Sequence, residues 1–260
     1  ELVKGGADLD KWDLYGRSPV YMAADVSTLP MKGNGAMAVI PSADTLTAID
    51  VARMMLAKGA NPNIQLKRRP PYRDVPQDRG GDGMLAQNAT PLLRAARGGD
   101  DKMTALLLEY KALVDLPSKE GITPLMAAAG VDYGQRVTRG RNRTDEGVLA
   151  TMDLLVKAGA NVKATDNIGE TALHRAATGG QTVLVKRFLE AGLDVNARDM
   201  QRQTALHQAA QAGHGDVVRL LLAHGANPAF TDVSGSTALA LAEKRKAEEV
   251  AKLLRAGPPK

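Results

Sequence analysis

The hydrophobic residues of this chain come in pairs of short blocks separated by polar loops. In "TALHQAAQAGHGDVVRLLLAHG", residues 204–225, the first block places Leu206, Ala209 and Ala210 three and four positions apart. The second block consists of Val217, Val218, Leu220, Leu221 and Leu222. Apolar residues at these spacings lie on one face of an α-helix. The pattern therefore predicts two short amphipathic helices.

The same pair of blocks repeats along the whole chain. Its first block occurs as "SPVYMAA", "TPLLRAA", "TPLMAAA", "TALHRAA", "TALHQAA" and "TALALAE", beginning at Ser18, Thr90, Thr123, Thr171, Thr204 and Thr237. A second mark, such as "AGAN" or "HGAN", ends at Asn61, Asn161, Asp194 and Asn227. Consecutive first blocks are 72, 33, 48, 33 and 33 residues apart. The distances between the two marks attribute the longer spacings to insertions near 27–44, 65–87 and 131–147.

A 33-residue period that carries T-P-L-H-x-A and "GHGDVVRLLLAHGAN" resembles the ankyrin repeat. The resemblance covers all six copies and implies an all-α fold, a solenoid of stacked helix-turn-helix units with β-turn fingers. We expect one ankyrin-repeat domain over residues 1–260, because such units bury their apolar faces only against their neighbours. Residues 1–10 would end a preceding repeat, five repeats would start near 13, 85, 118, 166 and 199, and 232–257 would form a C-terminal cap.

Local signals agree with this register. Gly192 and Gly225 fall where a helix must stop with a left-handed residue. Thr144, followed by Asp145 and Glu146, predicts a capped helix start after the third insertion. Charged residues interrupt the outer face of the predicted cap at Lys244, Lys246, Glu248, Glu249, Lys252 and Arg255.

Composition narrows the classes of function. A net charge of +5, from 34 basic and 29 acidic residues, is too weak by itself to indicate nucleic-acid or membrane binding. The absence of cysteine excludes disulfides and thiolate metal sites. No apolar run approaches the roughly 18 residues of a membrane span, and no signal peptide begins at Glu1. An export signal would lie upstream or have been removed, so localisation stays open; we expect a monomer.

A structural role explains each of the four histidines, which are His174, His207, His214 and His224. The resemblance implies that His174 and His207, at the fourth motif position, bond to Thr171 and Thr204. The four recur one unit apart instead of converging, which argues against a metal or catalytic site.

The recurring carboxylates also have a structural explanation. Asp166, Asp199 and Asp232 occupy the same position in three fingers, where we expect each to accept backbone N–H bonds. The chain contains no G-x-S-x-G elbow, no Walker loop and no paired Cys motif. We therefore expect neither an enzyme nor a bound cofactor.

The resemblance implies that ligands meet the concave face, formed by finger tips and first helices. The register assigns to this face Met22, Asp25, Arg94, Arg97, Arg175, Thr178, Gln208 and Gln211 from helices, and Trp12, Thr165, Arg198 and Thr231 from fingers. Four of these residues predict a stripe of partly exposed positive charge that engages carboxylates: Arg94, Arg97, Arg175 and Arg198. The alternative is scattered, solvated arginines.

Trp12 is the only tryptophan, and it falls on a finger together with Tyr15. An exposed tryptophan there predicts an anchor of the kind that dominates binding energies. The alternative is that Trp12 packs against a preceding repeat.

The insertion at 131–147 contains Arg136, Arg139, Arg141 and Arg143. It has no interleaved aromatics for stacking on bases, which disfavours nucleic-acid binding. Two interpretations remain open: a cover for the edge of the stack, or a contact with a partner.

The sequence therefore predicts a non-enzymatic scaffold that binds a partner protein through its concave face and its N-terminal-half insertions. We hypothesise that the partner carries an acidic segment. The alternative is a recognition or inhibitory segment of a larger enzyme whose catalytic domain lies outside this chain.

Overall fold

A computed structural model describes residues 5–27, 46–68, 87–130 and 144–257. These residues form twelve α-helices and one isolated β-bridge, between Thr231 and Thr237. The chain divides into two compact units, one of residues 1–128 with 136–160 and one of 129–135 with 161–260. Most of the three predicted insertions, including the four loop arginines, and the start of the predicted preceding repeat lie outside the described residues.

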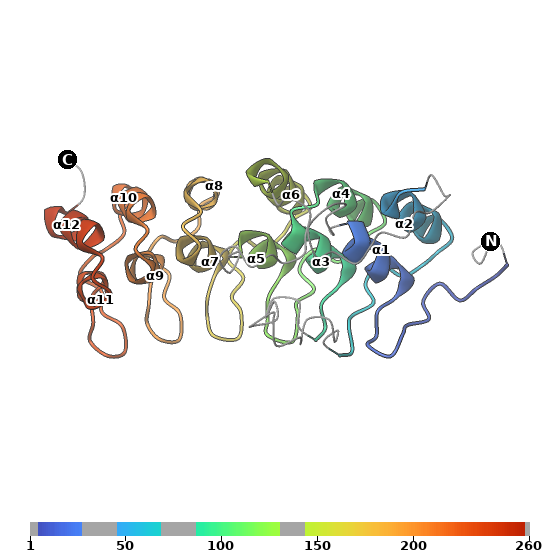
Figure 1. The fold of residues 1–260 in the computed structure, drawn as a ribbon, viewed down its shortest axis with the longest axis horizontal. Helices are drawn as coiled ribbons and strands as arrows, with labels where there is room; N and C mark the ends of the chain where they lie inside the picture. Colours follow the sequence, from blue (N-terminus) through green and yellow to red (C-terminus); the bar gives the residue numbers. More distant parts are fainter. Residues whose placement is uncertain (1–4, 28–45, 69–86, 131–143, 258–260) are drawn as a thin grey trace, which may run out of the picture. The chain divides into compact units, whose positions relative to one another are not determined.

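The first unit is built from helix pairs stacked in two layers (Figure 1). Its helices are α1 (Pro19–Ser27), α2 (Ala48–Ala57), α3 (Pro91–Gly98), α4 (Asp101–Glu109), α5 (Pro124–Ala129) and α6 (Asp145–Lys157). Helix α1 packs on both α2 and α3, while α4 packs on α2, α3 and α6. The first helix of each pair thus lies in one layer and the second helix in the other.

The second unit repeats this arrangement with shorter connections. Its helices are α7 (Ala172–Thr178), α8 (Thr182–Glu190), α9 (Ala205–Ala212), α10 (Gly215–Ala223), α11 (Ala238–Lys244) and α12 (Glu248–Ala256). Helix α9 packs between α7 and α11, and α10 packs between α8 and α12. An extended loop ending in a tight turn, the finger, precedes each first helix (Figure 1).

Helix ends follow the signals in the sequence. The side chain of Thr144 accepts the Gly147 N–H at the start of α6, as predicted. Gly192 and Gly225 both have a φ of 83°, in the left-handed region, as predicted for residues that stop a helix.

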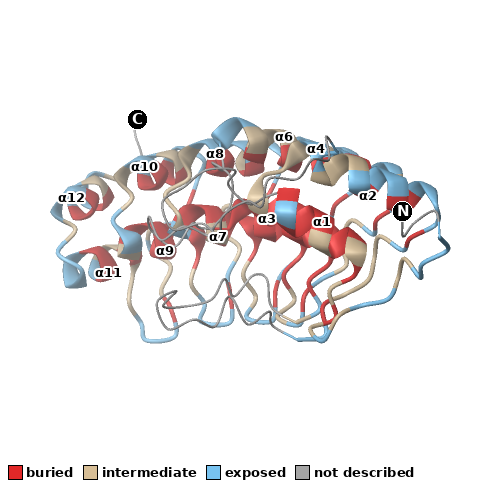
Figure 2. Cartoon of the chain, turned by 45° about the vertical axis from the view of Figure 1, so that its right-hand side comes forward, coloured by how far each residue is buried: buried red, intermediate tan, exposed pale blue. Residues whose placement is uncertain are grey.

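The core lies between the two layers (Figure 2). In α9, Leu206, Ala209 and Ala210 are fully buried, and in α10 Val218 is fully buried. Leu220, which the pattern places on the same apolar face, is only half-buried. Small alanines let neighbouring helices approach closely, so each helix pair buries its apolar face against the next pair.

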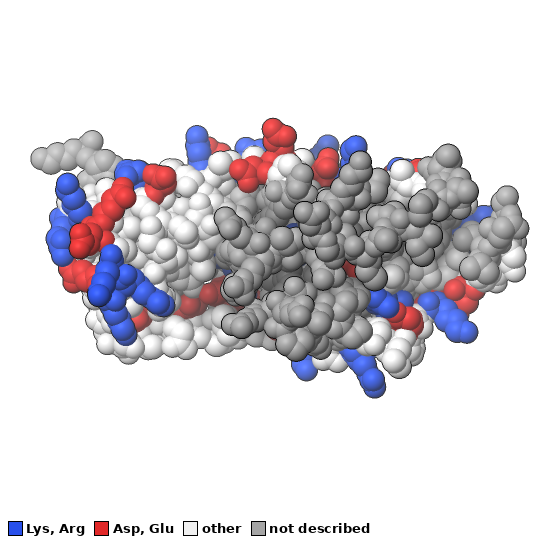
Figure 3. Space-filling view, viewed as in Figure 1, with Lys and Arg blue, Asp and Glu red and all other residues white. Residues whose placement is uncertain are grey.

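The end of the second unit formed by α11 and α12 carries mixed charges (Figure 3). All six residues predicted to interrupt the face of the cap are exposed: Lys244, Lys246, Glu248, Glu249, Lys252 and Arg255.

Because contacts are local, we expect residues 161–260 to fold when expressed alone. The circular dichroism spectrum of this fragment should be helical and should show a cooperative thermal transition. A random-coil spectrum at low temperature would contradict the prediction, whereas a fragment of residues 178–227, which cuts through α7, should be much less helical.

Candidate functional site

Each finger turn of the second unit is held by one carboxylate. Asp232 Oδ1 accepts the N–H groups of Ser234 at 2.8 Å and Ser236 at 2.9 Å. Asp166 and Asp199 accept backbone N–H bonds in the same way. The predicted structural role of these carboxylates is confirmed, because Oδ1 of each accepts N–H groups of the turn that it holds.

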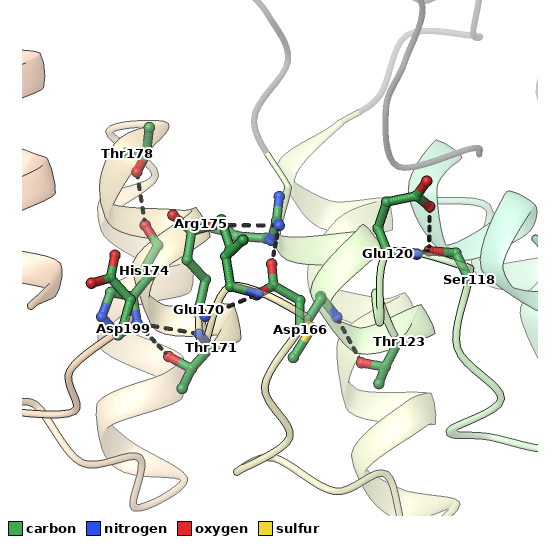
Figure 4. Close-up of polar contacts among 12 residues, drawn as sticks. Ser118, Glu120, Thr123, Asp166, Glu170, Thr171, His174, Arg175, Thr178 and Asp199 are labelled. Atoms are coloured by element: carbon green, nitrogen blue, oxygen red, sulfur yellow. Dashed lines mark hydrogen bonds and ion pairs between the residues drawn. The ribbon is translucent and has the colours of Figure 1, made fainter. Parts of the chain in front are cut away.

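A buried histidine ties each of two fingers to its first helix. His174 Nδ1 accepts the Thr171 N–H at 3.2 Å and lies 2.9 Å from the Thr171 hydroxyl (Figure 4). Its Nε2 lies 3.2 Å from the carbonyl oxygen of Gln203 in the next finger. With Nδ1 accepting, the proton of the neutral ring is on Nε2, which donates to Gln203. His207 makes the same contacts with Thr204, so the predicted histidine–threonine bonds are confirmed.

Burial lowers the pKa of His174, and also that of His207, because the fully buried rings are costly to charge. Unfolded histidine titrates near about pH 6.5. Below that pH the unfolded chain binds more protons than the native chain. The second unit should therefore keep its full stability above about pH 6.5 and lose up to about 1.4 kcal/mol per pH unit per histidine below it.

Urea unfolding at pH 7.5, 6.5 and 5.5 measures this dependence. Replacing His174 with Gln should lower stability at pH 7.5 and reduce its loss between pH 6.5 and 5.5. The His224→Gln variant is the matched control, since this histidine is exposed. An unchanged pH dependence in the His174 variant would show that burial of this ring is not its origin.

Side chains on the first helices of the second unit form a connected polar chain. Arg175 pairs with Asp166 and, at 3.3 Å, with Glu170 (Figure 4). The Gln208 amide donates to Glu170 at 2.7 Å and accepts from the Thr178 hydroxyl at 2.6 Å. Sequence reasoning missed Glu170, although it directly precedes the motif threonine. Arg175 and Gln208, both predicted to face a partner, are thus joined through this carboxylate.

A hollow of about 390 Å³ opens beside this chain. It is lined by Glu170, Thr178, Gln203, Gln208, Gln211, Ala212 and Arg245. Most of these side chains offer hydrogen-bonding groups, so the hollow suits polar parts of a partner better than an apolar ligand.

In the first unit, Trp12 is 48% exposed on its finger. The ammonium of Lys67 lies 3.2 Å from the centre of a Trp12 ring, a cation–π contact. The Lys67 N–H donates to the carbonyl oxygen of Tyr15 at 3.0 Å, which fixes the two segments side by side. Sequence reasoning missed Lys67, because only backbone pairing between fingers brings it to the tryptophan.

The expectation that Arg94 and Arg97 are partly exposed is wrong. Both are buried, and Arg94 Nε lies 2.5 Å from Asp25 Oδ1. Asp25 lies on α1, the first helix of the preceding repeat, one turn after the half-buried Met22. A guanidinium this deeply buried requires a partner charge, and Asp25 supplies it.

Arg94→Met should lower the free energy of unfolding of the whole chain by about 3 kcal/mol, because Asp25 would lose its buried counter-charge. Arg53→Met is the matched control in the same unit, since Arg53 pairs with Glu109 at 3.4 Å on the exposed surface. This control should cost less than about 1 kcal/mol. Equal losses in urea unfolding would contradict a special role for the buried pair.

Arg198 is the predicted site arginine that remains exposed. Its guanidinium donates to the carbonyl oxygens of Arg202 and Thr231 and lies 5.2 Å from the Phe230 ring centre. These contacts join two neighbouring fingers.

Two absences within the described ranges concern metal binding and membrane crossing. No group of three or more His, Cys, Asp or Glu side chains there is arranged to hold a metal ion. No helix there combines the length and the apolar character needed to cross a membrane.

Stacked helix pairs, linked by carboxylate-held fingers, define this chain as a helical repeat protein. A family described as "Ankyrin repeats (3 copies)" matches residues 144–232 and 185–258. The chain is also similar to Inversin from Danio rerio, with 33% identity over 106 residues. That match covers 41% of this chain and 9% of Inversin. The repeats of residues 144–258 thus match ankyrin repeats, which generally mediate protein–protein interaction and are typically non-catalytic.

Proposed function

We propose that this protein is a non-enzymatic scaffold that binds a partner protein through its finger turns, its first helices and its N-terminal-half insertions. The half-exposed Trp12 carries the proposal. Trp12, Tyr15 and Met22 form the binding residues of the first unit. Those of the second unit are Arg175 and Arg198, while Gln208, which was also predicted to bind, is buried, so we propose that it supports the face from within.

Trp12 suits the role of an anchor for two physical reasons. A tryptophan that leaves water on binding contributes a large contact area at little cost in rotamer freedom. The ammonium of Lys67 stacks on its ring before any partner arrives, so less order remains to be imposed during binding. An anchor held in this way lengthens the lifetime of a complex.

The arginines divide into two roles. Arg94 and Arg97 are buried, so we propose that they support the face from within and do not meet the partner directly. Arg198 is exposed and attracts acidic groups of an approaching partner. The acidic segment that we propose for the partner would respond to this charge.

Trp12→Ala should speed dissociation of an identified partner and weaken binding by about 2 kcal/mol or more. Arg198→Glu should mainly slow association and reduce its salt dependence. Surface plasmon resonance of both variants at low and high salt measures these rates. Met54→Ala is the matched control, because Met54 is partly exposed on α2, away from the fingers.

If both variants bind like the parent while deletion of residues 131–143 abolishes binding, the fingers are not the site. The arginine-rich insertion would then be the binding element.

A further inference from the structure

The turns of the second unit expose apolar side chains at their tips. Ile168 is 54% exposed, Met200 is 66% exposed and Val233 is 55% exposed. Turn tips usually carry Gly, Asn, Asp or Ser, which suit the backbone and the solvent. Figure 2 shows these turn ends as exposed, below α7, α9 and α11. We name Ile168, Met200, Arg202 and Val233 the fingertip ridge.

Backbone hydrogen bonds fix the members of the ridge relative to one another. The Met200 N–H donates to the carbonyl oxygen of Ile168 at 2.9 Å. The Val233 N–H donates to the carbonyl oxygen of Gln201 at 3.0 Å. Ile168 and Met200 are therefore direct neighbours, and Val233 stands one finger further along. Such a ridge is preorganised, because backbone hydrogen bonds link its neighbouring fingers.

Arg202 occupies a turn position that usually requires glycine. Its φ is 59°, in the left-handed region, where the corresponding residues of neighbouring turns are Gly169 at 81° and Gly235 at 74°. A side chain in this region is strained, and such strain often accompanies function. Lys111 and Lys246 share a positive φ. Arg202 differs from them because it stands among the exposed apolar tips.

The exposed charges of the ridge and its border have one sign. The Arg202 guanidinium makes no ion pair within the described part of the chain, and Arg198 beside it is also exposed. The finger carboxylates Asp199 and Asp232 are buried in their turns. The ridge therefore combines apolar tips with positive charge.

We infer that the fingertip ridge docks an acidic, amphipathic α-helix of the partner, an inference that rests on the proposed scaffold function. A finger consists of two chain segments, so neighbouring fingers repeat about every 10 Å. Seven residues of an α-helix rise about 10.5 Å, and three or four residues rise about 5 Å. The shorter spacing within a heptad stripe thus suits the directly paired tips of Ile168 and Met200. The longer spacing, from one heptad to the next, suits the step to the next finger.

The chemistry of the ridge favours a helix over a proline-rich segment. Proline-rich segments dock into grooves lined by aromatic side chains, whereas the three exposed tips are aliphatic. Acidic residues along the border of the helical stripe would pair with Arg202 and Arg198.

A synthetic helical peptide tests the inference against the full chain. The probe has about 21 residues, mostly Glu and Ala, with leucines in a heptad stripe and a fluorophore at one end. Fluorescence anisotropy should show that Met200→Ser weakens binding at least about tenfold. Val183→Ser is the matched control on α8, because Val183 is 52% exposed, and it should leave affinity unchanged.

Arg202→Gly tests separately the positive charge and the backbone strain of this position. It should weaken binding of the probe about fivefold, because a charge is lost. The same change should raise the midpoint of thermal unfolding by about 2 °C, because glycine relieves the strain. Arg219→Ala, on the exposed face of α10, should not alter affinity. Unchanged affinity in the Arg202 variant would overturn the charged part of the inference.

Three results would overturn docking of a helix. The first is that a peptide with the same composition but scattered leucines binds equally well. The second is that a proline-rich acidic peptide binds more tightly than the helical probe. The third is that vesicles containing phosphatidylserine bind the chain and lose this binding in Met200→Ser.

Trp12→Ala distinguishes this inference from the proposed function. It should leave binding of the probe unchanged, because Trp12 lies in the other unit. If the probe does not bind while Trp12→Ala still weakens binding of a natural partner, only the docking of a helix on the fingertip ridge is rejected. If the probe binds but Trp12→Ala does not change binding of a natural partner, only the role of Trp12 as an anchor is rejected.

Discussion

A pair of helices about nine residues long cannot bury its own apolar faces, and this constraint governs the molecule. Leu206 in α9 becomes fully buried only because α7 and α11 lie on either side of that helix. The period of the sequence follows from the same requirement. Each pair must present the next pair with a matching surface, so the same small and apolar residues recur at the same positions.

The fingers lie outside the helices, so their backbone N–H and carbonyl groups need other hydrogen-bond partners. Asp232 holds its own turn, and the histidine–threonine pair joins a finger to the following helix. His174 also reaches the carbonyl oxygen of Gln203 in the neighbouring finger. The polar residues that look most like catalytic groups in the sequence are therefore engaged in holding the repeat together.

Burial sorts the arginines by role. Arg94 is enclosed and paired with Asp25, whereas Arg198 spans two fingers at the surface and keeps its charge available. Arg175 lies between these extremes, since Asp166 and Glu170 surround it on a partly exposed helix. The charges of Arg94 and Arg175 are thus already compensated within the protein. The fingers also expose the aromatic Trp12 and the aliphatic Ile168, Met200 and Val233.

The sequence by itself determined the repeat, the helix ends and the structural roles of the histidines and the finger carboxylates. Each of these depends on residues close together in the chain, or on a motif repeated at a fixed period. Thr144 capping α6 and Gly225 ending α10 are examples, because a helix end is decided within a few residues.

Only the tertiary structure decided which side chains meet across neighbouring repeats and which stay exposed. The register placed Asp25 and Arg94 on one face, but their distance and burial depend on how two helix pairs approach. Lys67 reaches Trp12 through pairing between fingers, and the tips of Ile168 and Met200 become neighbours through one backbone bond. Periodicity specifies the face on which a residue lies, whereas solvent exposure depends on every neighbour that packs against it.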